Sequence, residues 1–232
     1  MKIQQEVEMK KYYDVLRRCS LFEGISDSDL MPMMGCVGGT VKKFDKRENI
    51  FSEGEEAKKV GIMLSGSAQI VRVDYYGNRT IMENVSPSEL CGESFACGGA
   101  DEIPVDIVAT ESSEVLLMDS ARITRSCSNA CGFHQQMIFN LMKIMAVKNL
   151  RFHQKIEITS KRTTREKLMT YLMIEAKKKR SDTFDIPYDR QELADYLEVD
   201  RSGLSAEISK LRREGVLLSE KNRFTLLDRR KI

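Results

Sequence analysis

The feature that most constrains this chain is the stretch of residues 189–217, which reads DRQELADYLEVDRSGLSAEISKLRREGVL. Asp189 followed by Glu192 is a capping pattern that predicts the start of a helix. The inward face of this helix is formed by Leu193, Ala194 and Leu197. After a short turn at residues 198–200, Asp200 can cap a second helix, whose inward positions are Leu204, Ile208 and Leu211. Two short helices joined by so tight a turn, with a small alanine where they cross, predict a helix-turn-helix.

The residues on either side of this motif complete a small domain. Gly215 is placed to end the second helix, and two β-type runs at residues 216–218 and 224–227 flank a turn, which predicts a hairpin wing. Upstream, Thr163 and Glu166 form another capping pattern, which predicts a helix over residues 163–180, and a strand-like link follows at residues 184–187. We therefore expect a winged helix-turn-helix domain over residues 159–232.

In this motif the N-terminal end of the second helix enters the major groove of DNA. The candidates for contact with base edges are Arg201, Ser202 and Ser205, and Ser209 lies on the same outward flank. The candidates for contact with phosphates are Arg190, Gln191, Lys221 and Arg223. Residues 159–232 hold 18 Lys+Arg against 13 Asp+Glu, a net charge of +5, whereas residues 1–158 hold 19 against 22, a net of −3. A basic domain favours double-stranded DNA as the partner, and the alternative is an ordinary helix pair with a solvated basic surface.

The sequence before this domain contains three stretches with different hydrophobic patterns. Residues 10–36 have a helical pattern with a candidate N-cap at Ser26, and residues 40–118 then form short β-type runs punctuated by glycines, which predicts an all-β barrel or roll. Residues 131–158 form a long helix in which apolar residues recur at alternating steps of four and three. This candidate seam consists of Ile138, Met142, Met145, Asn149, Phe152 and Ile156. The pattern predicts a parallel homodimer, and the alternative is a single helix packed on its own barrel.

Composition excludes several classes of protein. The 232 residues suffice for two domains of ordinary size, and we find no apolar run long enough to span a bilayer. The charged N-terminal sequence does not resemble a signal peptide, so we expect a cytoplasmic protein. The six cysteines are scattered, which fits reduced thiols rather than a disulfide framework. With two histidines, no phosphate-binding glycine loop and no nucleophile motif, we expect neither catalysis nor a cofactor.

Taken together, the chain resembles the cyclic-AMP receptor protein and fumarate–nitrate regulator (CRP/FNR) family over nearly its whole length. The matching parts are Gly54, the LSG of residues 64–66, the CGES of residues 91–94, the long helix, and DRSGLSAEISKLRREG from Asp200 onward. The resemblance implies an α+β fold made of a cupin-like β-roll (residues 1–128), a dimerisation helix (129–158) and a winged helix-turn-helix (159–232). It also implies a homodimer that recognises a two-fold symmetric operator, activates or represses transcription, and, as family members often do, contacts RNA polymerase.

The sensor departs from the pattern of the cyclic-nucleotide-binding members. In those members a glutamate holds the ribose and an Arg-Ser or Arg-Thr pair holds the cyclic phosphate. Here the glutamate is Glu93, but Ile103 and Pro104 stand where the pair is expected. Neither side chain can make charge-assisted contacts to a phosphate, so we do not expect cyclic AMP as the effector. The candidate pocket residues are Gly92, Glu93, Ser94, Ile103 and Pro104, and the pocket either holds another small-molecule effector or is empty.

Two other functions fit parts of the sequence. In one, the chain is a small-molecule-binding module whose helix-turn-helix contacts protein only, because Ala206 stands where relatives usually carry a second arginine. In the other, thiols such as Cys91 and Cys97 act as a redox switch. The tight N-terminal cysteine cluster of iron–sulfur members is absent. The spacing of Cys127, Cys131 and His134 could place three ligands on one helix face, but no fourth ligand follows, so we expect no metal site.

Overall fold

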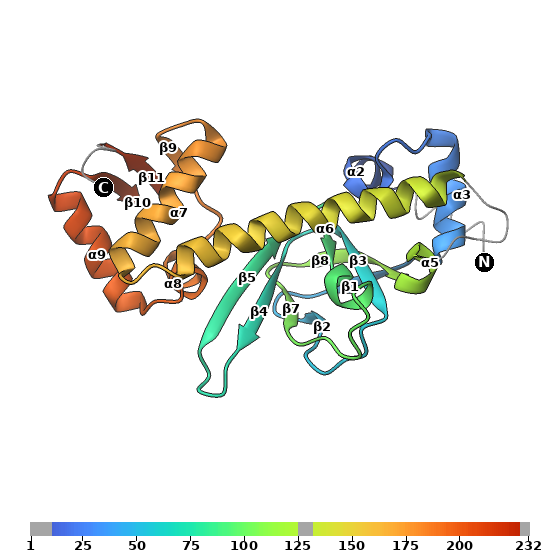
Figure 1. The fold of residues 1–232 in the computed structure, drawn as a ribbon, viewed down its shortest axis with the longest axis horizontal. Helices are drawn as coiled ribbons and strands as arrows, with labels where there is room; N and C mark the ends of the chain where they lie inside the picture. Colours follow the sequence, from blue (N-terminus) through green and yellow to red (C-terminus); the bar gives the residue numbers. More distant parts are fainter. Residues whose placement is uncertain (1–10, 125–131, 228–232) are drawn as a thin grey trace. The chain divides into compact units, whose positions relative to one another are not determined.

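The computed structural model describes residues 11–124 and 132–227, and they form two compact units. The first unit runs to Asp74 and from Met82 to Asn149, and the second takes Tyr75–Ile81 and the residues from Leu150 onward, so the units divide inside one helix. That helix, α6 (Gly132–Thr159), is continuous in Figure 1 and matches the long helix predicted from the sequence. Among the described residues, no helix combines the length and the apolar character needed to cross a membrane.

The first unit begins with three short helical segments, α2 (Tyr13–Arg18), η1 (Ser20–Phe22) and α3 (Asp27–Val37). The sequence predicted one helical region here, but Cys19 and Glu23 adopt extended ψ angles and interrupt it. Ser26 is the N-cap of α3, as predicted, and its hydroxyl accepts a hydrogen bond from the Asp29 amide. Gly38 ends α3 in the left-handed conformation.

Eight strands form the β-roll predicted for the first half of the chain. They are β1 (Thr40–Phe44), β2 (Asn49–Phe51), β3 (Lys59–Ser65), β4 (Ala68–Val73), β5 (Arg79–Val85), β6 (Leu90–Cys91), β7 (Asp106–Ala109) and β8 (Ser113–Asp119). One sheet has the order β1-β8-β3-β6 and the other β2-β7-β4-β5. The LSG motif has a structural reason: Gly66 has φ +77, and a Cβ there would lie 2.3 Å from the Ser113 hydroxyl. Two short helices, α4 (Glu93–Ala96) and α5 (Ser120–Thr124), complete the unit.

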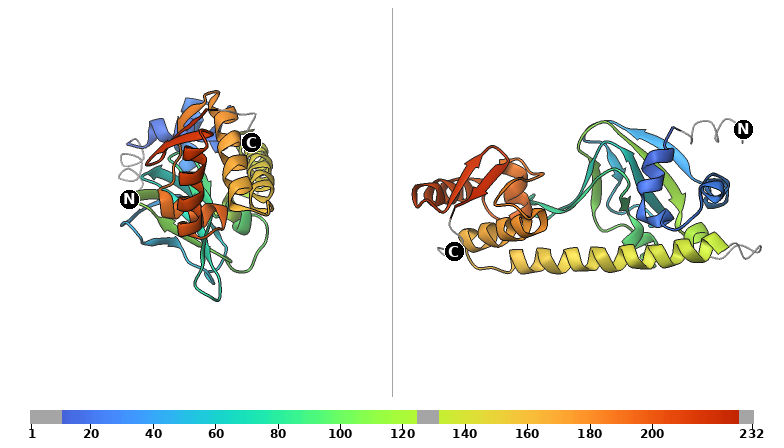
Figure 2. Two further views of the ribbon diagram at one scale, coloured as in Figure 1. Left: turned by 90° about the vertical axis from the view of Figure 1, so that its left-hand side faces the viewer. Right: turned by 90° about the horizontal axis from the view of Figure 1, so that it is seen from above.

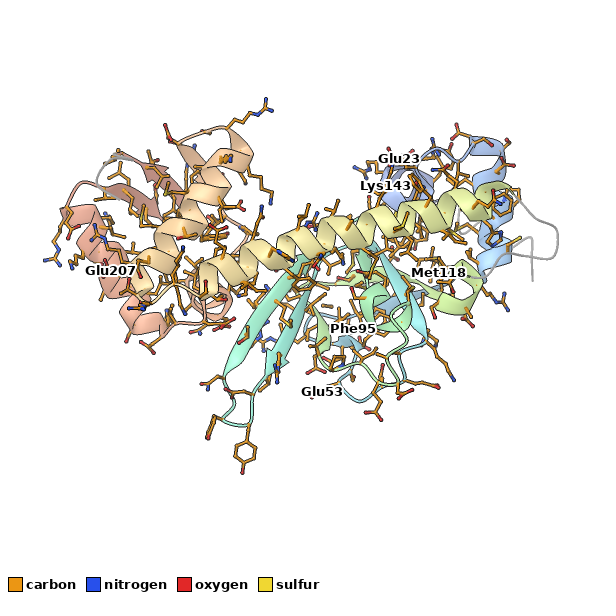
Figure 3. The ribbon with its side chains drawn as sticks, in the orientation of Figure 1. Glu23, Glu53, Phe95, Met118, Lys143 and Glu207 are labelled. Carbon is orange, nitrogen blue, oxygen red and sulfur yellow. The ribbon has the colours of Figure 1, made fainter. Side chains whose placement is uncertain are left out.

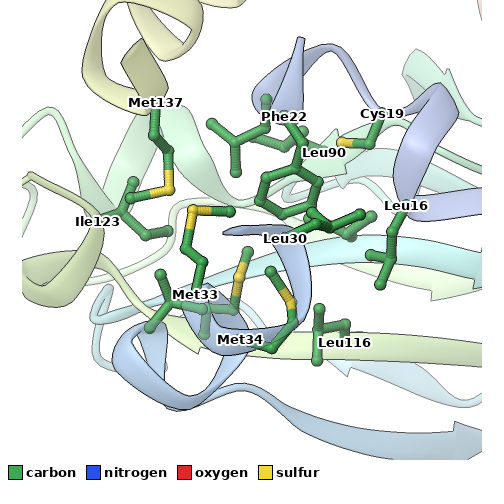
Figure 4. Close-up of a cluster of buried hydrophobic side chains, with 14 of the residues drawn as sticks. Leu16, Cys19, Phe22, Leu30, Met33, Met34, Leu90, Leu116, Ile123 and Met137 are labelled. Carbon is green, nitrogen blue, oxygen red and sulfur yellow. The ribbon is translucent and has the colours of Figure 1, made fainter. Parts of the chain in front are cut away.

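A hydrophobic cluster joins the N-terminal helices, the β1-β8-β3-β6 sheet and the first turns of α6 (Figure 4). Met137 and Leu141 of α6 are buried in this cluster together with Phe22, Leu30 and Leu116. The buried Asn140 amide, on the same side of α6, donates to the backbone oxygens of Leu21 (3.0 Å) and Glu23 (2.7 Å). The start of α6 is therefore fixed to the first unit by packing and by hydrogen bonds.

The second unit includes the winged helix-turn-helix. It contains α7 (Thr164–Lys179), α8 (Arg190–Leu197) and α9 (Arg201–Arg213), with a sheet of order β10-β11-β9 made of β9 (Thr183–Asp185), β10 (Leu217–Glu220) and β11 (Arg223–Leu226). Figure 2 shows α9 and the β10–β11 hairpin side by side. The strand-like link of the sequence is β9, which pairs with the wing. Tyr171, Tyr188 and Tyr196 pack their rings together, the last two stacked at 4.7 Å between centroids.

Candidate DNA-binding surface and sensor pocket

The two helices of the motif begin at the predicted caps. Asp189 and Glu192 form a complete capping box at α8, and Glu198 closes that helix in the left-handed conformation. The Asp200 carboxylate accepts from the Gly203 amide (2.9 Å) and from the Ser202 hydroxyl. These hydrogen bonds hold the pKa of Asp200 below its usual value. The N-terminal turn of α9 is thus fixed by its own side chains.

The proposed base-reading residues lie on the free side of α9. Leu204, Ile208 and Leu211 are buried, whereas Arg201, Ser202 and Ser209 are exposed and Ser205 is half-buried. The Ser209 hydroxyl donates to the Ser205 carbonyl (2.9 Å). Because Arg201 is exposed and begins the helix, its side chain is accessible to a ligand at the first turn of α9.

The candidate phosphate contacts fall into two groups. Lys221 and Arg223 are exposed on the wing, and Lys221 occupies a left-handed turn position. Arg190 is half-buried: its guanidinium donates to the Ser219 hydroxyl (3.1 Å) and to the Lys221 carbonyl (3.3 Å), and it lies over the Phe224 ring. Arg190 therefore holds the wing against α8, a role that the sequence did not indicate. Gln191 is exposed and donates to Asp195 (2.8 Å).

A brace that the sequence did not indicate fixes α9 from the other side. Arg165 of α7 pairs with Glu214 (2.8 Å) and with Glu207 (3.5 Å), which is labelled in Figure 3. These two ion pairs connect α7 to α9 and to the residue that ends it.

The centre of the sensor segment is a buried ion pair. Glu93, at the start of α4, has 1% of its side chain exposed, and Lys148 of α6 has 7% exposed. The Lys148 ammonium lies 2.8 Å from Glu93 Oε1 and 3.3 Å from Glu83 Oε2, and it donates to the Leu90 carbonyl at 2.9 Å. Burial alone lowers the pKa of Lys148, but Glu93 and Glu83 outweigh burial and raise it. The ammonium is therefore charged at neutral pH.

The remaining predicted pocket residues have different surroundings. Gly92 is left-handed with φ +78, and the Ser94 hydroxyl donates to Glu93 Oε1 (3.3 Å). Ile103 is buried in the core of the β-roll, and its backbone is hydrogen-bonded to Gly54 and Glu55. Pro104 is exposed. Glu93 and Ser94 are thus brought together, whereas Ile103 serves the core and Pro104 faces solvent.

The predicted seam of α6 lies only partly on its free face. Met142 and Ile156 are 60% and 64% exposed and Asn149 is exposed, whereas Ile138, Met145 and Phe152 are half-buried. Met145 packs against the hydrophobic cluster of the first unit. The predicted seam is partly covered because the most buried side chains of α6 lie on a neighbouring stripe, which we call the inward seam. It consists of His134, Met137, Leu141, Ile144, Lys148, Lys155 and Ile158. The exposed apolar residues of α6 also include Phe139 and Leu150, so the free face is turned slightly from the predicted seam.

Three of the described thiols, those of Cys19, Cys91 and Cys97, do not favour redox chemistry. Burial raises the pKa of Cys19 and of Cys91 to about 12 and that of Cys97 to about 11, so these groups stay protonated at neutral pH. Cys36 is exposed, and Cys127 and Cys131 lie outside the described residues. Within the described residues no group of three or more metal-ligating side chains is found.

Lys148 and Lys155 are buried charged residues that the sequence did not indicate. Lys155 is also buried: it donates to the Tyr196 carbonyl, lies 3.6 Å from Glu198 Oε1, and has its ammonium 4.0 Å from the centre of the Tyr196 ring. Both lysines share the inward seam with apolar residues, two helical turns apart. A lysine within an apolar seam was the signal that could have revealed them.

Comparison with known proteins agrees with this architecture. The cyclic nucleotide-binding domain family matches residues 41–129, and the Crp-like helix-turn-helix domain family matches residues 166–232. The transcriptional activator protein FnrL of Cereibacter sphaeroides is 23% identical over 196 residues, covering 80% of this chain and 75% of that protein. FnrA of Stutzerimonas stutzeri, also a transcriptional activator protein, is 26% identical over 190 residues, covering 79% and 75%.

A solved structure supports the fold. That of the c-di-GMP responsive global regulator CLP from Xanthomonas campestris has a TM-score of 0.72 at 14% identity, covering 88% of this chain and all of that one (100%). A β-roll of the cyclic nucleotide-binding type, a long helix and a Crp-like helix-turn-helix define a class of DNA-binding transcription regulators. The chain has one domain of each of the two matching families and is a DNA-binding transcription regulator of the CRP/FNR type.

Proposed function

We propose that the chain acts as a homodimeric transcription regulator that recognises a palindromic operator and responds to an effector other than cyclic AMP. The observation that carries the proposal is the N-terminal turn of α9, where Arg201 is exposed on a helix that is capped and braced. An arginine there can donate two hydrogen bonds to the O6 and N7 acceptors of a guanine. The transcriptional activators that the chain resembles support the regulatory role. Contact with RNA polymerase is part of the same proposal.

The free face of α6 supports the homodimer. Met142, Leu150 and Ile156 are apolar and largely exposed on one helix, and pairing with a second copy would remove them from water. A parallel pair of these helices would set two copies of α9 toward half-sites roughly 34 Å apart.

The sensor geometry supports an effector other than cyclic AMP. Ile103 and Pro104 offer no positive charge to a cyclic phosphate, and Glu93 is already paired with a lysine. A buried phosphate without a cation would leave its charge uncompensated.

The decisive experiment is selection of bound sequences from a palindromic DNA library at moderate salt, followed by comparison of two variants. We expect Arg201→Ala to relax the preference at one base pair of each half-site, with a loss of discrimination of about 1–3 kcal/mol. Arg212→Ala is the matched control, because Arg212 is an exposed arginine in the last turn of the same helix. It should lower affinity for all sequences alike. Failure of the wild-type chain to prefer any sequence over random DNA would overturn the proposal.

A further inference from the structure

The carboxylate that should bind an effector is already bound within the chain. Glu93 is among the most buried charged residues of the first unit, and a buried carboxylate is stable only when a cation or several donors compensate it. Lys148 reaches it from α6 at 2.8 Å, and the Ser94 hydroxyl adds a second contact to the same oxygen, Oε1.

The geometry leaves little of this interaction free for another ligand. The Lys148 ammonium lies 2.8 Å from Glu93 Oε1 and donates to the Leu90 carbonyl at 2.9 Å, and Glu83 Oε2 lies 3.3 Å away as a second ion-pair partner. A pair of sugar hydroxyls would need both oxygens of Glu93, and Oε1 is already occupied. Only Oε2 has no hydrogen-bond partner among the described atoms.

We propose that Lys148 is the built-in ligand of Glu93, a primary ammonium that occupies this carboxylate in place of a soluble effector. The inference deepens the proposed function, because it assigns the occupant of the effector-binding carboxylate. It follows that α6 is anchored to the β-roll without any added ligand, so that the chain binds its operator without cyclic nucleotide. An effector that enters this pocket must compete with Lys148 for Glu93.

The test replaces the tethered ammonium by a free one. Lys148→Ala removes three carbons and the ammonium, which n-propylammonium matches in length and charge. We expect this variant of the full chain to melt on the order of 10 °C below the wild type and to lose roughly tenfold or more in operator affinity. Added n-propylammonium should restore part of both losses, whereas 1-propanol, which has the same length but no charge, should restore neither.

Lys143→Ala is the matched control. Lys143 lies on the same helix but is 53% exposed, and its pairing with Glu23 is long, at 3.9 Å (Figure 3). Its loss should leave melting and DNA binding close to wild type. The proposal is overturned if Lys148→Ala behaves like Lys143→Ala, or if 1-propanol restores as much as n-propylammonium.

Two further arms keep the outcome decisive. If Lys148→Ala does not accumulate, Glu93→Gln gives the same information: we expect lower melting and weaker binding that n-propylammonium does not correct, and wild-type behaviour would overturn the proposal. If the wild-type chain binds no operator, the proposed function fails, but the melting measurements with and without n-propylammonium still test the role of Lys148.

Discussion

Lys148 and Lys155 of α6 are both buried, but the charges of their ammonium groups are compensated by different partners. Lys148 belongs to the first unit and meets two carboxylates, Glu93 and Glu83, which raise its pKa. Lys155 belongs to the second unit and meets the Tyr196 carbonyl, the Tyr196 ring and one half-exposed carboxylate, that of Glu198. Burial, together with the positive charge of Lys167, outweighs Glu198 and lowers the pKa of Lys155 to about 8.

The difference shows that burial alone does not determine what a lysine does on a helix. Where two carboxylates are buried beside it, the ammonium is held as an ion and its removal leaves charges uncompensated. Where the partners are mostly neutral, burial lowers the pKa of the ammonium. Lys148 is therefore an electrostatic anchor, whereas Lys155 is a packed side chain with a lowered pKa.

The largest expected effect that tests this comparison is that of Lys148→Met. The variant keeps the volume but leaves Glu93 buried without its cation, so we expect a loss of about 3–5 kcal/mol in the free energy of unfolding of the first unit. Urea unfolding followed by circular dichroism measures the loss.

Adding Glu93→Gln to Lys148→Met checks the cause of that loss. The double variant has no buried Glu93 charge to compensate, so it should be more stable than Lys148→Met alone. Additive losses in the two variants would show that the ion pair is not what stabilises this region.

Features of the fold and of the candidate site could be predicted from the sequence where the interacting residues lie close together along the chain. The caps at Ser26, Thr163, Asp189 and Asp200 were predicted and are confirmed, because a cap and its partner amide are three residues apart. The strands and the long helix were predicted for the same reason, since their periodicity is local.

The partners of the two lysines could not be predicted in this way. Lys148 meets Glu93 and the Leu90 carbonyl, and Lys155 meets the HTH turn, only after the chain has folded. The seam was interpreted from its apolar residues, so the inward seam that carries both lysines was overlooked. Arg190 was assigned to phosphate because it is basic and begins α8, whereas its contacts to Ser219 and Lys221 depend on the folded wing.

The next largest effect concerns pH. The folded-state pKa of Lys155, about 8, lies below the ordinary value of 10.5, so the unfolded chain binds more protons between these values. The contribution of Lys155 to stability should therefore rise with pH from about 8 to 10.5, with a slope of up to about 1.4 kcal/mol per pH unit. For Lys148 the pH dependence has the opposite sign. Its raised pKa gives a contribution to stability that is complete below pH 10.5 and is lost as pH rises through the folded-state pKa.

Unfolding measured as a function of pH in the wild type and in Lys155→Met isolates this effect. Thiols and other lysines titrate in both proteins, so their contributions cancel in the difference. Parallel curves for the two proteins between pH 8 and 10.5 would contradict the lowered pKa of Lys155.

At pH 7, Lys155→Met should have a smaller effect than Lys148→Met. Methionine loses the hydrogen bond to the Tyr196 carbonyl and the contact with Glu198, but it also removes the cost of burying a charge. We expect a change within about 1 kcal/mol in the free energy of unfolding of the second unit. A loss as large as that of Lys148→Met would show that the two lysines are anchors of the same kind.

The smallest expected effect is that of Glu198→Gln. Glu198 is 43% exposed, so the energy of its ion pair with Lys155 is largely screened, and we expect stability to change by only a few tenths of a kcal/mol. Its charge nevertheless supports the protonated form of Lys155, so the substitution should lower the pKa of Lys155 further below about 8. Carbon-13 resonances of the lysine Cε atoms, followed through a pH titration, measure this value directly. An unchanged pKa in Glu198→Gln would mean that the Tyr196 carbonyl and ring alone hold the ammonium, and Lys155 would then differ from Lys148 even more than the structure indicates.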